Sequence, residues 1–167
     1  MTEFDWREEP VPAGLPVLQV HGWLADETGR FLLRDDADGA RFQLAGGKRE
    51  NADRGWAHTL LRESAEECQV TLATDSIAYL GHQVVTEDPA QPGAYAQVRL
   101  FGVITEFGPS APDPDSGLVY RRLMTAASRA ATLLDWGLPG ELQSRAAVRA
   151  ARRTGLPAGD RVPDSYA

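Results

Sequence analysis

The segment from Gly46 to Gln69 constrains the fold more than any other part of the sequence. Two adjacent glycines, Gly46 and Gly47, end a strand pattern, and a polar stretch continues from them to Gly55. Glycine allows backbone turns that residues with a Cβ resist. Over 56–69 the apolar and small residues recur every three or four positions along one side, which predicts a helix. The sequence therefore predicts a strand, a tight polar loop and a helix in direct succession.

Three glutamates gather on one side of the predicted helix. Glu63, Glu66 and Glu67 are related by steps of three and four residues, so their carboxylates lie within reach of one another. Like charges placed in this way destabilise a helix unless a cation lies among them. Because Mg²⁺ prefers carboxylate oxygens, the spacing predicts a divalent-metal site on an exposed helix face. Arg62 cannot share that face, and we expect it to fix the site by reaching a carboxylate or a loop carbonyl.

The same segment resembles the Nudix box, G-x5-E-x7-R-E-U-x-E-E-x-G-U, where U is an aliphatic residue. Gly47 matches the leading glycine, Val70 matches the last aliphatic position, and 62–63 and 66–67 match the acidic core. There are four departures: a loop longer by one residue, Asp53 in place of the glutamate, Ser64 in place of an aliphatic residue, and Gln69 in place of the last glycine. The loop insertion leaves the role of Asp53 open, whereas the metal-ligand core is intact.

The resemblance implies a Nudix hydrolase, with a Nudix-like α/β/α sandwich built on a mixed β-sheet. Its activity would be metal-dependent hydrolysis of a pyrophosphate bond in a nucleoside diphosphate linked to another moiety. Glu63, Glu66 and Glu67 would bind Mg²⁺, with Mn²⁺ as the alternative ion. Such an ion neutralises phosphate charge and lowers the pKa of a bound water.

The resemblance also implies the catalytic residues, which are Glu66, Glu67 and Arg62. One carboxylate must act as the general base in a hydrolysis of this kind. Glu66 and Glu67 are candidates within the box, and Glu87 and Glu106 are candidates from later strands or loops. The sequence does not indicate which of these four carboxylates is the general base.

Substrate contacts are predicted at two places. Gly46 and Gly47 lie beside the predicted metal site and would contact the substrate. In the last long strand pattern, alternation puts Tyr95, Gln97 and Arg99 on one face of the sheet. We expect Arg99 to contact a substrate phosphate and Tyr95 to stack on a base, although a half-buried strand with a polar outer face explains the pattern equally well.

The patterns on either side of the box predict an α+β domain with a mixed sheet. Strands are expected over 17–24, 30–34, 41–44, 77–87 and 95–107. In the helical C-terminal third, Thr125 would cap a helix that ends at Gly137, and Pro139 would open another that ends at Gly155. We predict an N-terminal arm with little structure over 1–16, a single domain over 17–155, and a loose C-terminal tail over 156–167.

Composition narrows the class of protein. The chain has 167 residues, enough for one domain with a core. Its 17 basic and 24 acidic residues give a net charge of −7, which argues against a nucleic-acid polymer as partner. No apolar run approaches the roughly 20 residues of a membrane span, so no membrane partner is expected.

The cysteine count and the N-terminus favour a cytoplasmic setting. Cys68 is the sole cysteine, so an intrachain disulfide is impossible, and the acidic N-terminus lacks the order of a signal peptide. The expected partner is a small-molecule nucleotide, and the helical C-terminal third offers an interface for a homodimer.

Two other functions compete with the hydrolase. A catalytically silent Nudix domain, acting as a nucleotide-binding sensor or interaction module, would account for the altered loop. It would not account for three carboxylates that repel one another. An acidic α+β domain with an accidental resemblance is the third interpretation. No pattern selects among oxidised nucleotides, nucleotide sugars and coenzymes, because such groups are recognised by segments outside the box.

Overall fold

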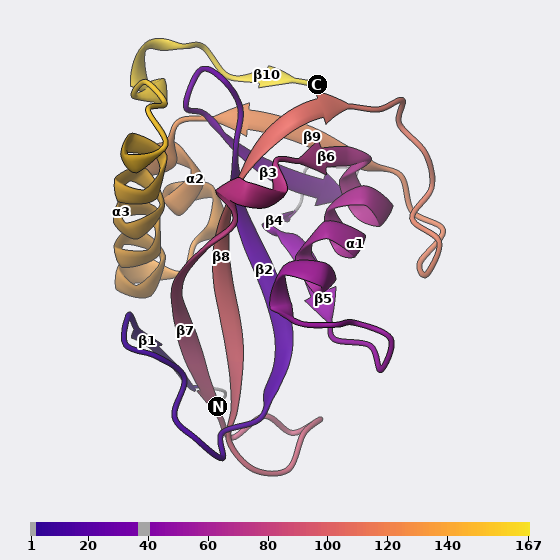
Figure 1. The fold of residues 1–167 in the computed structure, drawn as a ribbon, viewed down its shortest axis with the longest axis vertical. Coiled ribbons are helices and arrows are strands. Elements are labelled where there is room, and N and C mark those ends of the chain that lie inside the picture. Colours follow the sequence, from indigo (N-terminus) through magenta and orange to yellow (C-terminus); the bar gives the residue numbers. More distant parts are fainter. Residues whose placement is uncertain (1–2, 37–40) are drawn as a thin grey trace.

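A computed structural model describes residues 3–36 and 41–167. Figure 1 shows one layer of strands between helix α1 on one side and helices α2 and α3 on the other. No helix among the described residues is long and apolar enough to span a bilayer. The elements in chain order are β1 (Glu3–Arg7), β2 (Val17–Ala25), β3 (Phe31–Asp36), β4 (Phe42–Gln43), β5 (Ala45–Lys48), α1 (Trp56–Cys68), β6 (Val70–Leu72), η1 (Thr74–Ser76), β7 (Ala78–Thr86), β8 (Tyr95–Phe107), β9 (Tyr120–Thr125), α2 (Ala127–Leu134), α3 (Gly137–Arg153), η2 (Gly159–Arg161) and β10 (Ser165–Tyr166).

The sheet is mixed, as the sequence predicted. Its main order is β1-β7-β8-β2-β3-β9-β10, while β4 pairs with β3, β5 with β2, and β6 with β8. Strands β2 and β8 run parallel, from Val17 opposite Ala96 to Ala25 opposite Val103, and the other pairs are antiparallel. With helices on both faces, this confirms the α+β class and the α/β/α sandwich.

Alternation along the central strands divides the core into two clusters. On β8, Val98 and Leu100 face α1, whereas Phe101 faces α2 and α3. The same alternation places Val20 and Trp23 of β2 in opposite clusters. Burying one apolar side chain of this size contributes about 1.5–3 kcal/mol to the free energy of unfolding. Apolar packing on both faces of the sheet therefore holds the helices against it.

Both ends of the chain add strands to the sheet. Residues Glu3–Arg7 form β1 and pair antiparallel with β7, and Ser165–Tyr166 form β10 and pair with β9. The predicted absence of structure in the arm and in the tail is therefore wrong for these residues, while Met1 and Thr2 lie outside the described part. Edge strands of this kind are fixed by backbone hydrogen bonds to a neighbour, and their own sequence carries little pattern.

The start of the helical C-terminal third also differs from the prediction. Thr125 ends strand β9 instead of capping a helix, and its hydroxyl donates a hydrogen bond to Asp164 at 2.7 Å. Helix α2 follows with Ala126 as N-cap and ends at Leu134, three residues before the predicted Gly137. Helix α3 begins at Gly137, earlier than the predicted Pro139. The prediction missed β9 because its pairing with β3 is a long-range contact.

Helix α1 matches the prediction to within one residue. Leu60, Ser64 and Cys68, four residues apart, form its buried side. At Gly22 of β2 a Cβ would lie 2.6 Å from Leu60 Cδ1, so the helix packs closely on the strand because that residue is glycine. This close packing gives α1 a fixed position on the sheet.

Gln69 ends α1 in the left-handed conformation, with φ 49° and ψ 41°. Glycine adopts this conformation at no steric cost, which explains why the Nudix pattern has glycine there. In this chain the Gln69 amide donates to the Glu66 carbonyl at 2.8 Å, and its side-chain oxygen accepts from the Ala111 backbone at 3.2 Å. These hydrogen bonds offset the backbone strain.

We expect Ser64→Ala to stabilise the protein. The Ser64 side chain is 0% exposed, and within the described part of the chain its hydroxyl has no hydrogen-bond partner. Removing a buried hydroxyl that lacks a partner should raise the free energy of unfolding by about 1 kcal/mol, measured by urea denaturation. Ser128→Ala, at an exposed position of α2, is the matched control for helix propensity. Equal gains in both variants would show that the Ser64 hydroxyl carries no penalty.

Candidate functional site

The two glycines lie inside strand β5, where the sequence predicted a break in the strand. Gly46 has φ 143°, and a Cβ on it would lie 2.3 Å from the Val20 carbonyl oxygen. A Cβ on Gly47 would lie 2.7 Å from Glu63 Oε1. Gly46 therefore requires glycine, because its φ is positive and β5 passes close to the backbone of β2 there. A Cβ at Gly47 would instead displace the end of the Glu63 side chain.

Arg62 reaches a carboxylate, as predicted, and also the carbonyl of the last residue of β5. Its Nη2 donates to the Lys48 carbonyl at 2.9 Å and to Asp53 Oδ2 at 3.1 Å, and its Nε donates to Asp53 Oδ1 at 3.2 Å. The Asp53 side chain is 1% exposed and also accepts from the Thr59 hydroxyl and the Glu50 backbone, each at 2.9 Å. The Arg62 hydrogen bonds hold the pKa of Asp53 well below its usual range. The loop is one residue longer than in the Nudix pattern, and aspartate is shorter than the glutamate of that pattern. The extra loop residue thus allows Asp53 to reach Arg62.

The Arg62 guanidinium also lies among the other acids of the site. Its Nη1 is 3.0 Å from Glu63 Oε1, 3.0 Å from Glu66 Oε2 and 3.3 Å from Glu50 Oε1. The prediction that Arg62 cannot share the face of the glutamates was wrong, because its long side chain folds back over its own helix. One guanidinium therefore offsets the repulsion among these carboxylates.

Glu67 is fixed from the side of the sheet. Its Oε2 accepts a hydrogen bond from the Gly46 backbone at 2.9 Å and lies 3.1 Å from Arg34 Nε on β3. Burial raises the pKa of Glu67 to about 7, against the opposing effects of Arg34 and the Gly46 amide. The carboxylate is thus held in place but is not fully neutralised.

The predicted exposure of the acidic face is wrong for two of its members. Glu63 and Glu67 are each 8% exposed, whereas the Glu66 side chain is 29% exposed. Burial raises the pKa of Glu63 as well, although Arg62 opposes it. The reason is tertiary: β5 and the loop after it cover this side of α1.

The donor chemistry of the site fits a divalent cation. Among the described residues, no group of three or more His, Cys, Asp or Glu side chains is arranged to hold a metal ion. Glu63, Glu66 and Glu67 nevertheless offer hard oxygen ligands within two turns of one helix. Burial raises the pKa of Glu63 and of Glu67, so their charged forms need compensation from outside the two side chains. A cation would supply the missing compensation.

The loop between β8 and β9 brings two further acids that the sequence analysis did not single out. The charge of Asp115 contributes to the raised pKa of Glu63, and that of Asp113 to the raised pKa of Glu67. Asp113 is 7% exposed and accepts hydrogen bonds from the Ser116 backbone at 3.0 Å and from its hydroxyl at 2.5 Å. The Pro- and Asp-rich composition of this connection was the available signal, but its contact with α1 is long-range.

The two later glutamates lie at opposite ends of the β7–β8 hairpin. Glu87 follows β7 directly and has φ 55°, while Glu106 is next to the last residue of β8. Neither is among the main charges that act on the pKa of Glu63 or Glu67.

The predicted substrate residues of β8 lie in different surroundings. Arg99 is 2% exposed and lines a cavity of about 780 Å³ together with Gln97, on the face of the sheet opposite α1. This agrees with the predicted alternation along the strand. Tyr95 is 4% exposed, lies outside the lining of that cavity and donates its hydroxyl to Asp88 at 2.8 Å. The structure therefore does not bring Tyr95 and Arg99 into one site.

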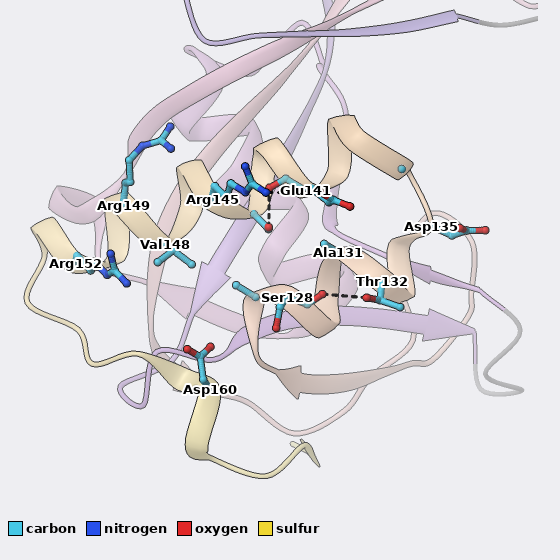
Figure 2. Close-up of a pocket in the computed structure, with 13 residues that line it drawn as sticks. Ser128, Ala131, Thr132, Asp135, Glu141, Arg145, Val148, Arg149, Arg152 and Asp160 are labelled. Carbon is cyan, nitrogen blue, oxygen red and sulfur yellow. Dashed lines mark hydrogen bonds and ion pairs between the residues drawn. The ribbon is translucent and has the colours of Figure 1, made fainter.

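A second hollow, of about 700 Å³, lies between α2 and α3, away from the box. Figure 2 shows Arg145, Arg149 and Arg152 projecting from α3 beside it. Arg149 pairs with Glu8 at 2.8 Å, and Arg145 lies 3.8 Å from Glu141. Ion pairs with partly exposed glutamates therefore engage two of these three arginines.

Comparison with known proteins identifies the fold. Neither a protein-family model nor a curated protein matches the sequence. Among solved structures, a mutant of the pyrophosphohydrolase BsRppH from Bacillus subtilis is 20% identical, with a TM-score of 0.53 over 65% of this chain and 63% of that one. A UDP-X diphosphatase is 12% identical, with a TM-score of 0.57 over 86% of this chain and 66% of that one. A Nudix hydrolase from Nitrosomonas europaea is 15% identical, with a TM-score of 0.56 over 86% and 93%.

These likenesses show that the chain has the Nudix fold. It spans 63% and 66% of the first two structures, just under two thirds of each.

We expect Asp53→Asn to destabilise the protein in a pH-dependent way. Breaking a buried ion pair from one side costs about 3 kcal/mol, so urea denaturation at pH 7 should show a loss of that size. Because the folded pKa of Asp53 is depressed, its contribution is present above the unfolded value of about 3.9 and declines as the pH falls below it. The difference between wild type and variant should therefore shrink from about pH 4 towards pH 2.

Glu50→Gln is the matched control for this prediction. The Glu50 side chain is 53% exposed and lies 3.3 Å from the same guanidinium, so its removal should cost under about 0.5 kcal/mol. A loss of equal size in both variants would contradict the special role assigned to Asp53.

Proposed function

We propose that this chain belongs to the Nudix family and is a metal-dependent pyrophosphohydrolase. Its substrate would be a nucleoside diphosphate linked to another moiety. The observation that carries the proposal is the arrangement around Arg62, which ties the loop through Asp53 and lies within 3.0 Å of both Glu63 and Glu66. The acidic core and the loop of the box form one structural unit in this arrangement.

Fold and motif support family membership from independent directions. The fold likeness rests on the path of the chain, whereas the box rests on the identity and spacing of particular residues. Two of the structural relatives are named as a pyrophosphohydrolase and a UDP-X diphosphatase. We extend the reaction class to this chain as part of the proposal.

The reaction is attack by water on one phosphorus of the P–O–P linkage. A bond forms from the water oxygen to that phosphorus, the bond to the bridging oxygen breaks, and two phosphate products leave. The proton of the attacking water passes to a carboxylate acting as general base. A divalent cation, Mg²⁺ or Mn²⁺, would be held by Glu63, Glu66 and Glu67 and would neutralise phosphate charge and activate the water.

The contacts and exposure of each residue indicate its role in this reaction. Arg62 positions the carboxylates and the loop, and Arg34 with the Gly46 amide holds Glu67. Glu66 is the most exposed acid of the core and is therefore the most accessible to a substrate. The candidates for the general base are Glu66, Glu67 and the two later glutamates, and we add Asp115 because its charge acts on Glu63.

The setting and partners form part of the same proposal. A small-molecule nucleotide is the expected partner, the cytoplasm is the expected compartment, and the helical C-terminal third is the expected surface for a homodimer.

The experiment is turnover of a panel of nucleoside triphosphates, nucleotide sugars, ADP-ribose and dinucleoside polyphosphates. Released phosphate is followed directly or after phosphatase treatment, with Mg²⁺ or Mn²⁺ and with chelator. We expect at least one substrate to be hydrolysed with either ion and none with chelator. Binding of a nucleotide without turnover would instead support the silent sensor or interaction module.

We expect Glu66→Gln and Glu67→Gln each to lower kcat by about 10²-fold or more, because each removes a metal ligand or a proton acceptor. Glu141→Gln on α3, far from the box, is the matched control and should leave kcat unchanged. Circular dichroism and thermal melting establish that each variant is folded. Unchanged turnover in both box variants would disprove the proposed site.

A further inference from the structure

The cavity that contains Arg99 has the size of a ligand site. Its volume of about 780 Å³ falls within the range of small-molecule pockets. It lies on the face of the sheet opposite α1. The lining residues are Phe4, Gln19, His21, Arg41, Phe42, Gln43, Leu44, Gln83, Gln97, Arg99, Leu133, Leu134, Asp135 and Trp136. Glutamine amides and aromatic rings thus surround one buried arginine.

The hydrogen-bond partners of Arg99 are neutral. Its Nε donates to Gln143 Oε1 at 3.1 Å, and its Nη2 donates to Gln97 Oε1 at 3.1 Å and to Gln83 Oε1. Within the described part of the chain, its Nη1 has one long hydrogen bond, 3.5 Å to the Val98 carbonyl. Among the described residues, none that accepts a hydrogen bond from Arg99 carries a charge, so the positive charge is solvated but not neutralised.

A buried cation of this kind is costly. Arg99 is 2% exposed, and burial lowers its pKa from the usual value to about 9. Removing an ion from water costs several kcal/mol unless an opposite charge compensates it. Arg34 and Arg62, by contrast, lie 3.1 Å and 3.0 Å from glutamate oxygens. Neutral amides around Arg99 leave its charge available to an anion from outside the chain.

Other polar groups of the cavity point to the same ligand chemistry. His21 lies beside Gln19, 3.1 Å from its Oε1, and Arg41 adds a second positive charge at an exposed position. Among the described residues, Asp135, also exposed, is the one acid in the lining. Next to Arg99, the amide nitrogen of Gln143 is buried and has no hydrogen-bond partner within the described residues. A positively charged pocket in a chain of net charge −7 attracts an anion.

The cavity adjoins the candidate catalytic site. Gln43 in its lining accepts from Arg34 Nη2 at 2.8 Å, and Arg34 Nε lies 3.1 Å from Glu67 Oε2. His21 pairs with Gly46 across β2 and β5, and the Gly46 amide donates to Glu67. These contacts place the cavity lining next to Arg34 and Gly46, the two groups that hold Glu67, while the cavity itself lies on the face of the sheet opposite α1.

We propose that this cavity binds an anionic group of the substrate outside the pyrophosphate, a carboxylate or a phosphate, with Arg99 as its counter-ion. The inference rests on the proposed function for the location of the pyrophosphate. It deepens that function by assigning a preference for substrates with an additional negative charge.

The test is a comparison of ligands that differ by one anionic group. UDP-glucuronic acid against UDP-glucose tests a carboxylate, and coenzyme A against dephospho-coenzyme A tests a phosphate. Binding to the full chain is measured by calorimetry without divalent ions, so the result does not depend on turnover. We expect the anionic member of at least one pair to bind about 10- to 100-fold more tightly, as a charge-assisted hydrogen bond contributes. The pair that shows the preference identifies the source of the anion.

Two variants and one control assign the preference to Arg99. Arg99→Gln removes the cation, and Gln143→Glu places a carboxylate beside Arg99 Nε, which now lies 3.1 Å from the Gln143 amide oxygen. Both should abolish the preference, and Gln143→Glu should do so in a stable protein because it creates a buried ion pair. Arg145→Gln removes an exposed arginine beside the other hollow (Figure 2) and should leave the preference intact.

The outcomes separate this inference from the proposed function. Equal binding of both members in both pairs, or no binding of either anionic compound at about millimolar concentration, overturns the inference whether or not the protein hydrolyses any substrate. A preference that survives in both Arg99→Gln and Gln143→Glu also overturns it. Absence of turnover across the nucleotide panel, with the anion preference present and lost in the variants, would overturn the proposed hydrolysis and leave the anion site standing.

Discussion

The ion pair between Arg62 and Asp53 is the interaction on which the rest of the site depends. It joins the middle of α1 to the loop that follows β5, and the same guanidinium holds the Lys48 carbonyl at 2.9 Å. Because this connection fixes the loop against the helix, Glu63 and Glu66 lie beside a cation instead of repelling one another in solvent. One arginine thus determines both the path of the loop and the electrostatics of the carboxylates.

The close approach of β5 to α1 explains the unusual environment of the acids. Gly47 leaves room for the Glu63 carboxylate, and the Gly46 amide donates to Glu67. Covering these groups removes water from them, which raises the pKa of both glutamates. A buried acidic cluster with uncompensated charge favours a bound cation, so the packing that costs stability also supports the proposed chemistry.

The fold was predictable wherever a local pattern carried the information. The alternation of β8 and the periodicity of α1 gave their boundaries to within one residue, and the positions of Gly47 and Arg62 indicated the site. The strands β1, β9 and β10 were missed because their pairing partners lie far away in the sequence. Asp113 and Asp115 were missed for the same reason, as their proximity to α1 follows from the course of a long connection.

The sequence by itself determined the α+β class with a mixed sheet and the helix with its three glutamates, and the resemblance to the Nudix box implied the sandwich. The class and the helix follow from periodicity, residue type and spacing, which act over a few residues. Tertiary structure alone decided that Glu63 and Glu67 are buried, that Asp53 reaches Arg62 despite the longer loop, and that Arg99 lies in a cavity where its hydrogen-bond partners among the described residues are neutral. Burial and charge compensation depend on which distant segments meet, and no local pattern encodes that.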